Sequence, residues 1–145
     1  MRLTILAAGH MKHSPEKELL LRYQNRLSMP IDIKEIKQEG PELEAHNFQK
    51  LLRPDTYIIA LDERGKSLTT LEFSNLLTNK VMPFYKQCTF IIGGADGIFE
   101  TIRAKSHTII NFGKMTWPHM LVRAMLVEQI YRVQQIQNNH PYHRE

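Results

Sequence analysis

The chain has 145 residues, of which 42% are hydrophobic and 23% charged, and its formal net charge is +4. This composition predicts one folded domain over residues 1–145 and argues against an intrinsically disordered chain. No apolar run approaches the roughly 20 residues that cross a bilayer, and the apolar start is too short for a secretory signal. We therefore expect a cytoplasmic protein without a membrane partner. The single cysteine, Cys88, excludes an internal disulfide and a multi-cysteine metal site.

A modest basic excess gives a sequence pI near 9.3, which is compatible with a polyanionic partner. The basic residues are spread along the chain, with a loose concentration in residues 10–26. A solvated helix face explains that concentration about as well as an RNA-binding surface does.

Strand-like and helix-like segments alternate from end to end. We expect strands at 2–8, 31–36, 57–61, 88–92 and 109–112, with the second at a sheet edge because apolar and polar residues alternate in it. We expect helices at 15–27, 42–52, 67–77, 98–105 and 118–137, the first opened by an N-cap at Ser14 and by Pro15. This order predicts an α/β fold, with a mostly parallel sheet covered by helices on both faces.

Glycine follows two of the predicted strands, at the edge where ligands of parallel sheets bind. Residues 62–65 should turn the chain at Gly65, and the segment 92–97, IGGADG, joins a buried strand to a helix. The second segment lacks the G-x-G-x-x-G spacing of dinucleotide sites, and no Gly-Lys-Ser or Gly-Lys-Thr follows it. A ligand-binding loop and a bare strand-to-helix turn both stay open.

The segment 111–119 between the last strand and the last helix is unusually apolar. Phe112, Met115 and Trp117 could bury a flat heterocycle, while backbone groups near Gly113 and Thr116 bind its edge. The alternative, which the residues alone favour, is a hydrophobic loop that caps the core.

The end of the chain concentrates reactive side chains. His140, Tyr142, His143 and Arg144 supply acid/base groups, a stacking ring and a fixed cation, and Pro141 prevents the helix from continuing through them. Termini usually fray, which is the simpler alternative. A zinc site would need a third ligand that the sequence does not offer, so we expect no metal. Cys88 begins a buried strand and is expected to be an inert core thiol, and no serine has a nucleophile-elbow context.

The order and spacing of three segments resemble the RlmH (YbeA) family of ribosomal large-subunit methyltransferases, over the whole chain. These segments are Leu61-Asp62 with a glycine after it, IGGADG at 92–97, and TWPHMLVR at 116–123. The ending NHPYHRE at 139–145 is the most specific part of the resemblance. Trp117 stands where the family commonly has an aliphatic residue.

The resemblance implies a homodimer of the SPOUT class, in which a C-terminal trefoil knot holds S-adenosylmethionine. It implies methylation of N3 of a pseudouridine in helix 69 of large-subunit ribosomal RNA, on assembled ribosomes. The tail, residues 138–145, would complete the active site across the dimer interface, with His140, Tyr142, His143 and Arg144 acting on the nucleotide. The implied cofactor-binding residues are Leu61, Gly94, Gly113, Lys114, Met115, Thr116, Trp117 and Pro118.

Two other functions remain as alternatives. One is a small basic α/β protein that binds ribosomal RNA without chemistry, and the cofactor loops argue against it. The other is a nucleotide-dependent oxidoreductase, which the missing glycine spacing disfavours.

Overall fold

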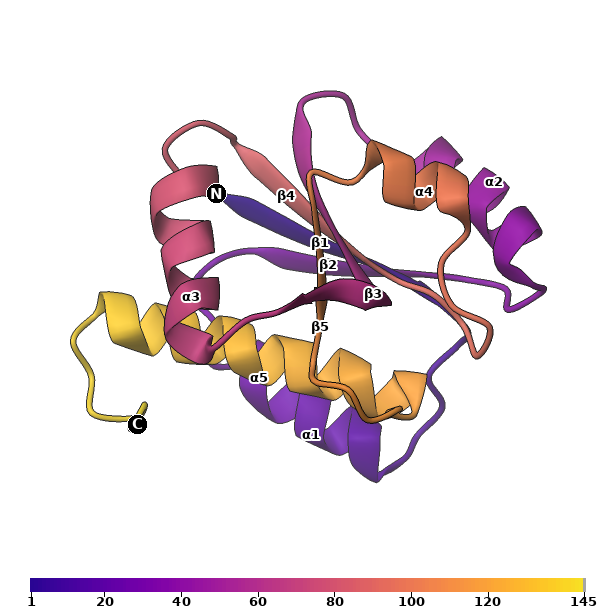
Figure 1. Cartoon of the computed structure of the whole chain (residues 1–145). Coiled ribbons are helices and arrows are strands. Elements are labelled where there is room, and N and C mark those ends of the chain that lie inside the picture. Colours follow the sequence, from indigo (N-terminus) through magenta and orange to yellow (C-terminus); the bar gives the residue numbers. More distant parts are fainter. Residues whose placement is uncertain (145) are drawn as a thin grey trace.

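The computed structural model describes residues 1–144 as a five-stranded sheet with helices packed on both of its faces (Figure 1). The strand order is β2-β1-β4-β3-β5, and every pairing is parallel, which confirms the predicted fold class. The strand predicted at 31–36 lies at the sheet edge, as its alternating pattern indicated. The strands are β1 (Arg2–Ala8), β2 (Ile31–Ile36), β3 (Thr56–Ser67), β4 (Gln87–Ile92) and β5 (Thr108–Asn111).

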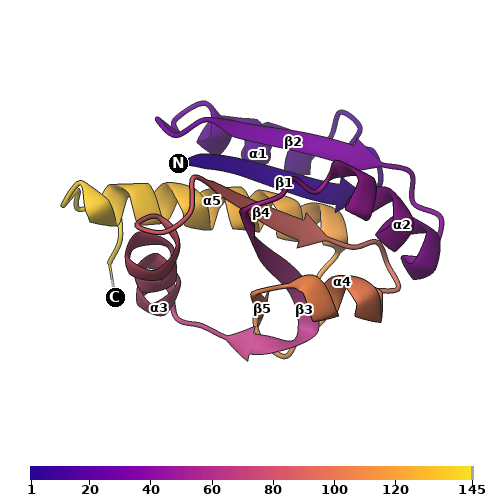
Figure 2. The same ribbon diagram turned by 90° about the horizontal axis from the view of Figure 1, so that it is seen from above.

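The helices divide between the two faces of the sheet (Figure 2). One face carries α1 (Pro15–Gln24), α3 (Thr70–Asn75) with the π-helix η1 (Leu76–Val81), and α5 (His119–Gln137). The other face carries α2 (Pro41–Leu51) and α4 (Glu100–Lys105). Ser14 caps α1 by accepting a hydrogen bond from the Lys17 amide, as predicted.

Neighbouring residues of each central strand point into different cores, because side chains alternate along a strand. In β4, Phe90 packs with α1, α3 and α5, whereas Ile91 packs with α2 and α4. The near-continuous apolar character of β4 follows from burial on both faces.

The turn predicted at 62–65 is wrong. β3 continues to Ser67, with an irregularity in its pairing to β5 between Leu61 and Lys66. Gly65 is needed there for close approach, since a Cβ atom on it would lie 2.6 Å from the backbone of Ile109. The following helix therefore starts later than predicted, at Thr70, where Thr69 and Glu72 form a capping box.

The first helix ends at Gln24 rather than near residue 27, and the third continues as a π-helix through Val81. Strand order and pairing do not record how the chain threads through itself, so the trefoil knot stays a prediction.

Candidate active site

A cavity of about 290 Å³ opens at the carboxyl edge of the sheet, where β4 and β5 end and where the pairing of β3 is irregular. Its wall consists of residues 61–64, 92–97 and 110–117, together with His119 and Val122 from the start of α5. Parallel strands with helical crossovers leave such a crevice at this edge, which is where α/β proteins bind ligands. The volume is close to the lower end of the roughly 300–1,000 Å³ typical of small-molecule sites.

The predicted cofactor-binding residues gather around this cavity. Pro118 is the exception, since it is not part of the wall and instead precedes α5 as its N-cap residue. The geometry therefore brings together residues that are up to 56 positions apart in the chain, from 61 to 117. The predicted residues in the wall are Leu61, Gly94, Gly113, Lys114, Met115, Thr116 and Trp117.

The apolar loop at 112–117 does not cap the core, contrary to what its residue types favour. The Met115 side chain is 78% exposed and Trp117 is 41% exposed, and only Phe112 packs against the core. The Trp117 indole N–H donates to the Phe112 carbonyl oxygen at 3.2 Å, which folds the loop back on itself beside the cavity. The loop therefore offers apolar surface to a ligand.

The glycine segment after β4 forms a tight turn. The Gly97 amide donates to the Gly94 carbonyl oxygen at 3.1 Å, and a Cβ atom on Gly93 would lie only 2.5 Å from the Gly97 carbonyl oxygen. Backbone atoms consequently come this close only because position 93 has no side chain.

Two buried carboxylates hold this turn in place, and neither is among the predicted site residues. Asp62, at the irregularity in β3, accepts a hydrogen bond from the Ile98 amide at 3.3 Å. Glu44, on α2, accepts one from the Gly94 amide at 3.3 Å and others from the amides of residues 39 and 40. The position of Asp62 directly after a buried apolar run is a usable signal, whereas nothing in the sequence around Glu44 connects it to residue 94.

Asn111 fixes the beginning of the apolar loop. Its side-chain oxygen accepts from the Ser67 hydroxyl at 2.6 Å and from the Gly113 amide at 3.0 Å, while its amide nitrogen donates to the Gly65 carbonyl oxygen at 2.7 Å. One side chain thus ties the loop to the end of β3. Sequence reasoning missed this residue too.

The first turns of α5 place an imidazole and a buried guanidinium beside the cavity. Burial, and then the Arg123 cation, lower the pKa of His119, against the opposing charge of Glu44. Arg123 is completely buried, where it donates to the carbonyl oxygens of residues 8 and 9 and pairs with Glu35. His119 is therefore favoured in its neutral form at neutral pH.

The tail begins where α5 ends and folds back on that helix. The Tyr142 hydroxyl donates to a Glu128 carboxylate oxygen at 3.0 Å, and its ring lies 4.8 Å from the Arg132 guanidinium carbon. Burial, then hydrogen bonding to Tyr23 and Glu128, raises the pKa of Tyr142, so this phenol stays neutral. Glu145 lies outside the described residues.

The cavity and the tail lie at opposite ends of α5 (Figure 1). A helix of 19 residues is about 28 Å long at 1.5 Å per residue, and the tail returns along only part of it. Within one chain the predicted tail residues His140, Tyr142, His143 and Arg144 are therefore not brought to the cavity. Their catalytic role stays a prediction.

Cys88 is not part of the cavity wall. Cys88 is buried in β4, and burial raises the pKa of its thiol, as expected for a core cysteine. Within residues 1–144, no three His, Cys, Asp or Glu side chains cluster closely enough to hold a metal ion. The same residues contain no helix with the length and apolar character required to span a membrane.

A cavity at the carboxyl edge of a parallel sheet, lined by a glycine turn and an apolar loop, is typical of α/β proteins that bind a small organic ligand. The family model described as "Predicted SPOUT methyltransferase" matches residues 1–143, and the chain belongs to that family.

Three relatives match this chain over almost the whole length of both proteins. The chain is 40% identical to "Ribosomal RNA large subunit methyltransferase H" of Paramagnetospirillum magneticum and 41% identical to the protein of that name from Rhodospirillum centenum, each over 99% of both chains. The protein of the same name from Zymomonas mobilis is 40% identical over 100% of this chain and 99% of its own. A solved structure, a probable methylase family protein from Haemophilus influenzae, has the same fold, with TM-score 0.59, 13% identity, and 99% of this chain and 70% of that chain covered.

Proposed function

We propose that the protein is an S-adenosylmethionine-dependent methyltransferase that methylates N3 of a pseudouridine in helix 69 of large-subunit ribosomal RNA. The observation that carries this proposal is the cavity, whose wall contains seven of the eight residues that the family resemblance assigns to the cofactor. The names of the relatives at about 40% identity support the ribosomal RNA substrate. The reaction would take place on assembled ribosomes in the cytoplasm.

The residues of the cavity wall fit this cofactor. Met115 and Trp117 expose apolar and aromatic surface that suits an adenine ring, and the glycine turn presents backbone to a ligand. Glu63 lies in the same wall and can attract a positively charged sulfonium group, whereas the Asp62 carboxylate is buried and paired with Arg64. When bound, S-adenosylmethionine supplies an electrophilic methyl group.

The acceptor nitrogen must lose a proton as its new N–CH₃ bond forms and the bond between the methyl group and the sulfonium sulfur breaks, with that electron pair staying on sulfur. One tail histidine, His140 or His143, accepts that proton, and the exposed Arg144 offsets the negative charge that develops on the ring. Tyr142 is a neutral hydrogen-bond donor in this arrangement, so it contributes by stacking or hydrogen bonding and not by taking the proton.

A second copy of the chain would bring the tail to a cavity. The outer face of α5 carries half-buried apolar residues near its start, Leu121 and Met125, and further along it carries Glu128 and Arg132, on which the tail of the same chain packs. If two such helices pack antiparallel about a two-fold axis, the end of one lies near the start of the other. Each cavity would then receive the partner's tail.

Sedimentation at micromolar concentration tests this shared site. We expect twice the chain mass of 17.0 kDa. A monomer under conditions where the protein is active would exclude completion of the cavity by a partner.

The central experiment follows labelled methyl transfer from S-adenosylmethionine into ribosomes that lack the modification, with mapping of the modified nucleotide. In parallel, the melting temperature is measured with S-adenosylmethionine, NAD or ATP, because a ligand of the folded state raises it. We expect S-adenosylmethionine to raise the melting temperature and NAD and ATP to leave it unchanged. Stabilisation by NAD would favour the oxidoreductase, and ribosome binding without methyl transfer would favour the non-catalytic RNA-binding protein.

The location of the cofactor is tested with Gly94→Val. A Cβ atom at this position would already lie 3.0 Å from the Gln38 side chain, so the larger valine side chain extends toward Gln38 or into the cavity. Calorimetric titration should show weaker binding of S-adenosylmethionine. Unchanged affinity in a folded Gly94→Val protein would place the cofactor elsewhere.

A further inference from the structure

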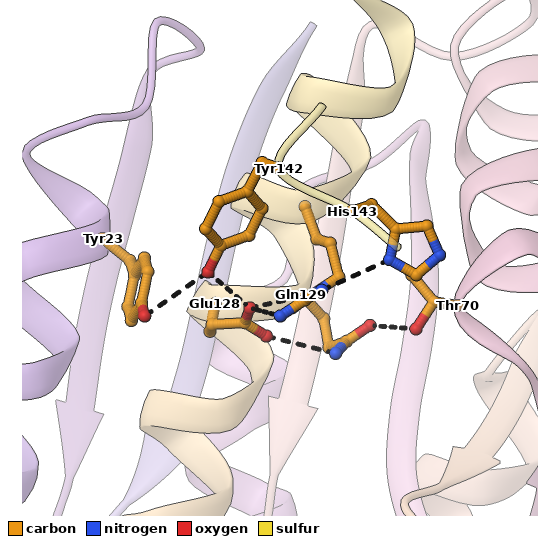
Figure 3. A network of polar contacts seen from close by, with 7 residues as sticks. Tyr23, Thr70, Glu128, Gln129, Tyr142 and His143 are labelled. Atoms are coloured by element: carbon orange, nitrogen blue, oxygen red, sulfur yellow. Dashed lines mark hydrogen bonds and ion pairs between the residues drawn. The ribbon is translucent and has the colours of Figure 1, made fainter. Parts of the chain in front are cut away.

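The tail is held by a polar network whose members come from three helices (Figure 3). Glu128 and Arg132, one turn apart on α5, form its centre, with Nε and a terminal nitrogen of Arg132 at 2.9 and 2.6 Å from the same carboxylate oxygen. On the side of α3, the Thr70 hydroxyl donates to Gln129, and the Gln129 amide donates to the second Glu128 oxygen. Contacts outside the tail therefore already hold Glu128 and Arg132 in place.

The pair contacts the tail at two consecutive residues. Glu128 accepts a hydrogen bond from the Tyr142 hydroxyl, and Arg132 lies over the Tyr142 ring. The Arg132 guanidinium also lies 3.3 Å from Nδ1 of His143. Because arginine only donates, Nδ1 is the acceptor, and a neutral His143 ring carries its proton on Nε2. One ion pair thus sets both the position of Tyr142 and the tautomer of His143, so His140 is the tail histidine that is left to accept the proton.

Ring packing supports the same position of the tail. The Tyr131 ring lies edge-on to Tyr142, with centroids 4.9 Å apart, and the Tyr23 hydroxyl lies 3.4 Å from the Tyr142 hydroxyl. Tyr142 and His143 are half-buried, whereas the residues on either side of them, Pro141 and Arg144, are exposed. The tail therefore has an anchored middle and exposed flanks.

We propose that Glu128 and Arg132 are positioning residues for methyl transfer, which grip Tyr142 and His143 so that Arg144 and His140 are presented to the nucleotide. This inference rests on the proposed function, since it assigns the tail to the methyltransferase site. A flexible arm would sample many positions, and misplacement by about 1 Å can lower a rate by about 100-fold. The ion pair removes that freedom without touching the substrate.

Arg132→Lys tests the arginine half of the pair. Lysine keeps the charge but loses the planar fork that reaches one carboxylate oxygen, one ring and one imidazole together. We expect kcat to fall on the order of 10-fold to 100-fold, with the Kd for S-adenosylmethionine and the melting temperature unchanged. Amide hydrogen exchange in residues 138–144 should become faster.

Arg2→Lys is the matched control, because Arg2 in β1 also reaches one carboxylate oxygen of Asp32 through Nε and a terminal nitrogen, at 3.2 and 2.7 Å, and takes no part in the tail network. It should leave kcat and exchange in the tail unchanged. Equal effects of the two substitutions would assign the loss to general destabilisation and overturn the proposal.

The glutamate half is tested by combining Glu128→Ala with Tyr142→Phe. Both remove the hydrogen bond between the Tyr142 hydroxyl and the Glu128 carboxylate, so the double variant should lose no more than the worse single variant. If the fold losses in kcat of the two single variants multiply in the double variant, the Tyr142 hydroxyl acts directly on the nucleotide, and Glu128 does not act by positioning Tyr142. If the wild-type protein transfers no methyl group, the proposed function fails, and tail exchange in Arg132→Lys still decides whether the pair anchors the tail.

Discussion

Two arginine–glutamate ion pairs involve α5, and they differ in burial and in how far apart their partners lie in the sequence. Arg123, near the start of the helix, pairs with Glu35 on β2, and its side chain is 1% exposed. Arg132, two and a half turns later, pairs with Glu128 on the same helix, and its side chain is 25% exposed. The first pair joins segments 88 positions apart, and the second joins neighbouring turns.

This difference separates stability from positioning. Removing one partner of a buried pair leaves an uncompensated charge in a poorly hydrated place, which costs several kcal/mol. Removing one partner of a partly exposed pair within a helix costs little, because water solvates the remaining charge. The pair beside the cavity should therefore hold the fold, while the pair beside the tail should control where reactive groups lie.

Deleting residues 140–145 should give the largest effect on activity. The anchored groups and Arg144 disappear together, so methyl transfer should fall by up to about 10⁴-fold, the upper range for lost acid/base groups. Calorimetry should still show binding of S-adenosylmethionine, because the cavity is built from other segments. Full activity of the truncated protein would show that the tail takes no part in the chemistry.

Arg123→Met should lower the free energy of unfolding by about 3 kcal/mol, mainly because the buried carbonyl groups of residues 8 and 9 lose the guanidinium donor, while the partly exposed Glu35 loses its partner. Arg132→Met should lower it by less than about 1 kcal/mol. Urea unfolding at one fixed protein concentration measures both variants. Equal losses would remove the distinction between the two pairs.

Arg144→Ala tests the exposed side of the tail. Loss of one preorganised cation should lower kcat by about 100-fold while leaving stability unchanged. Arg53→Ala, at another exposed arginine, serves as the control and should keep full activity. A comparable loss in the control would indicate a general electrostatic contribution to ribosome binding.

The pH dependence of stability should show the smallest effect. Burial alone would raise the pKa of Glu35, but the Met11 amide and Arg123 outweigh it, and the net pKa is lowered from its ordinary value of 4.5. The folded state therefore gains stability from ionised Glu35 above pH 4.5, and it loses this gain as the pH falls through the lowered value. Wild type should exceed Glu35→Gln in free energy of unfolding at neutral pH, and the difference should shrink as the pH falls below 4.5 through the lowered pKa. A constant difference in urea unfolding would contradict this coupling.

Local patterns predicted most of the fold but failed where distant backbone intervenes. The buried runs of β3 and β4 and the cap at Ser14 depend on adjacent residues, and their pattern alone placed them correctly. Gly65 looked like a turn because glycine is typical of turns, yet its actual reason is the backbone of Ile109, 44 positions further on. The same limit hid Glu44, whose contact with Gly94 spans 50 positions.

The sequence by itself determined the α/β class, the family and the segments that surround the cavity, because periodicity and motif spacing are properties of neighbouring residues. Only the tertiary structure decided that Met115 and Trp117 are exposed beside a cavity instead of packed into the core. It also decided that the tail lies against Glu128 and Arg132, in the second half of α5. Both outcomes depend on which surfaces the other helices and strands cover. A pattern of neighbouring residues carries no information about that, because burial is decided by segments that are distant in the sequence.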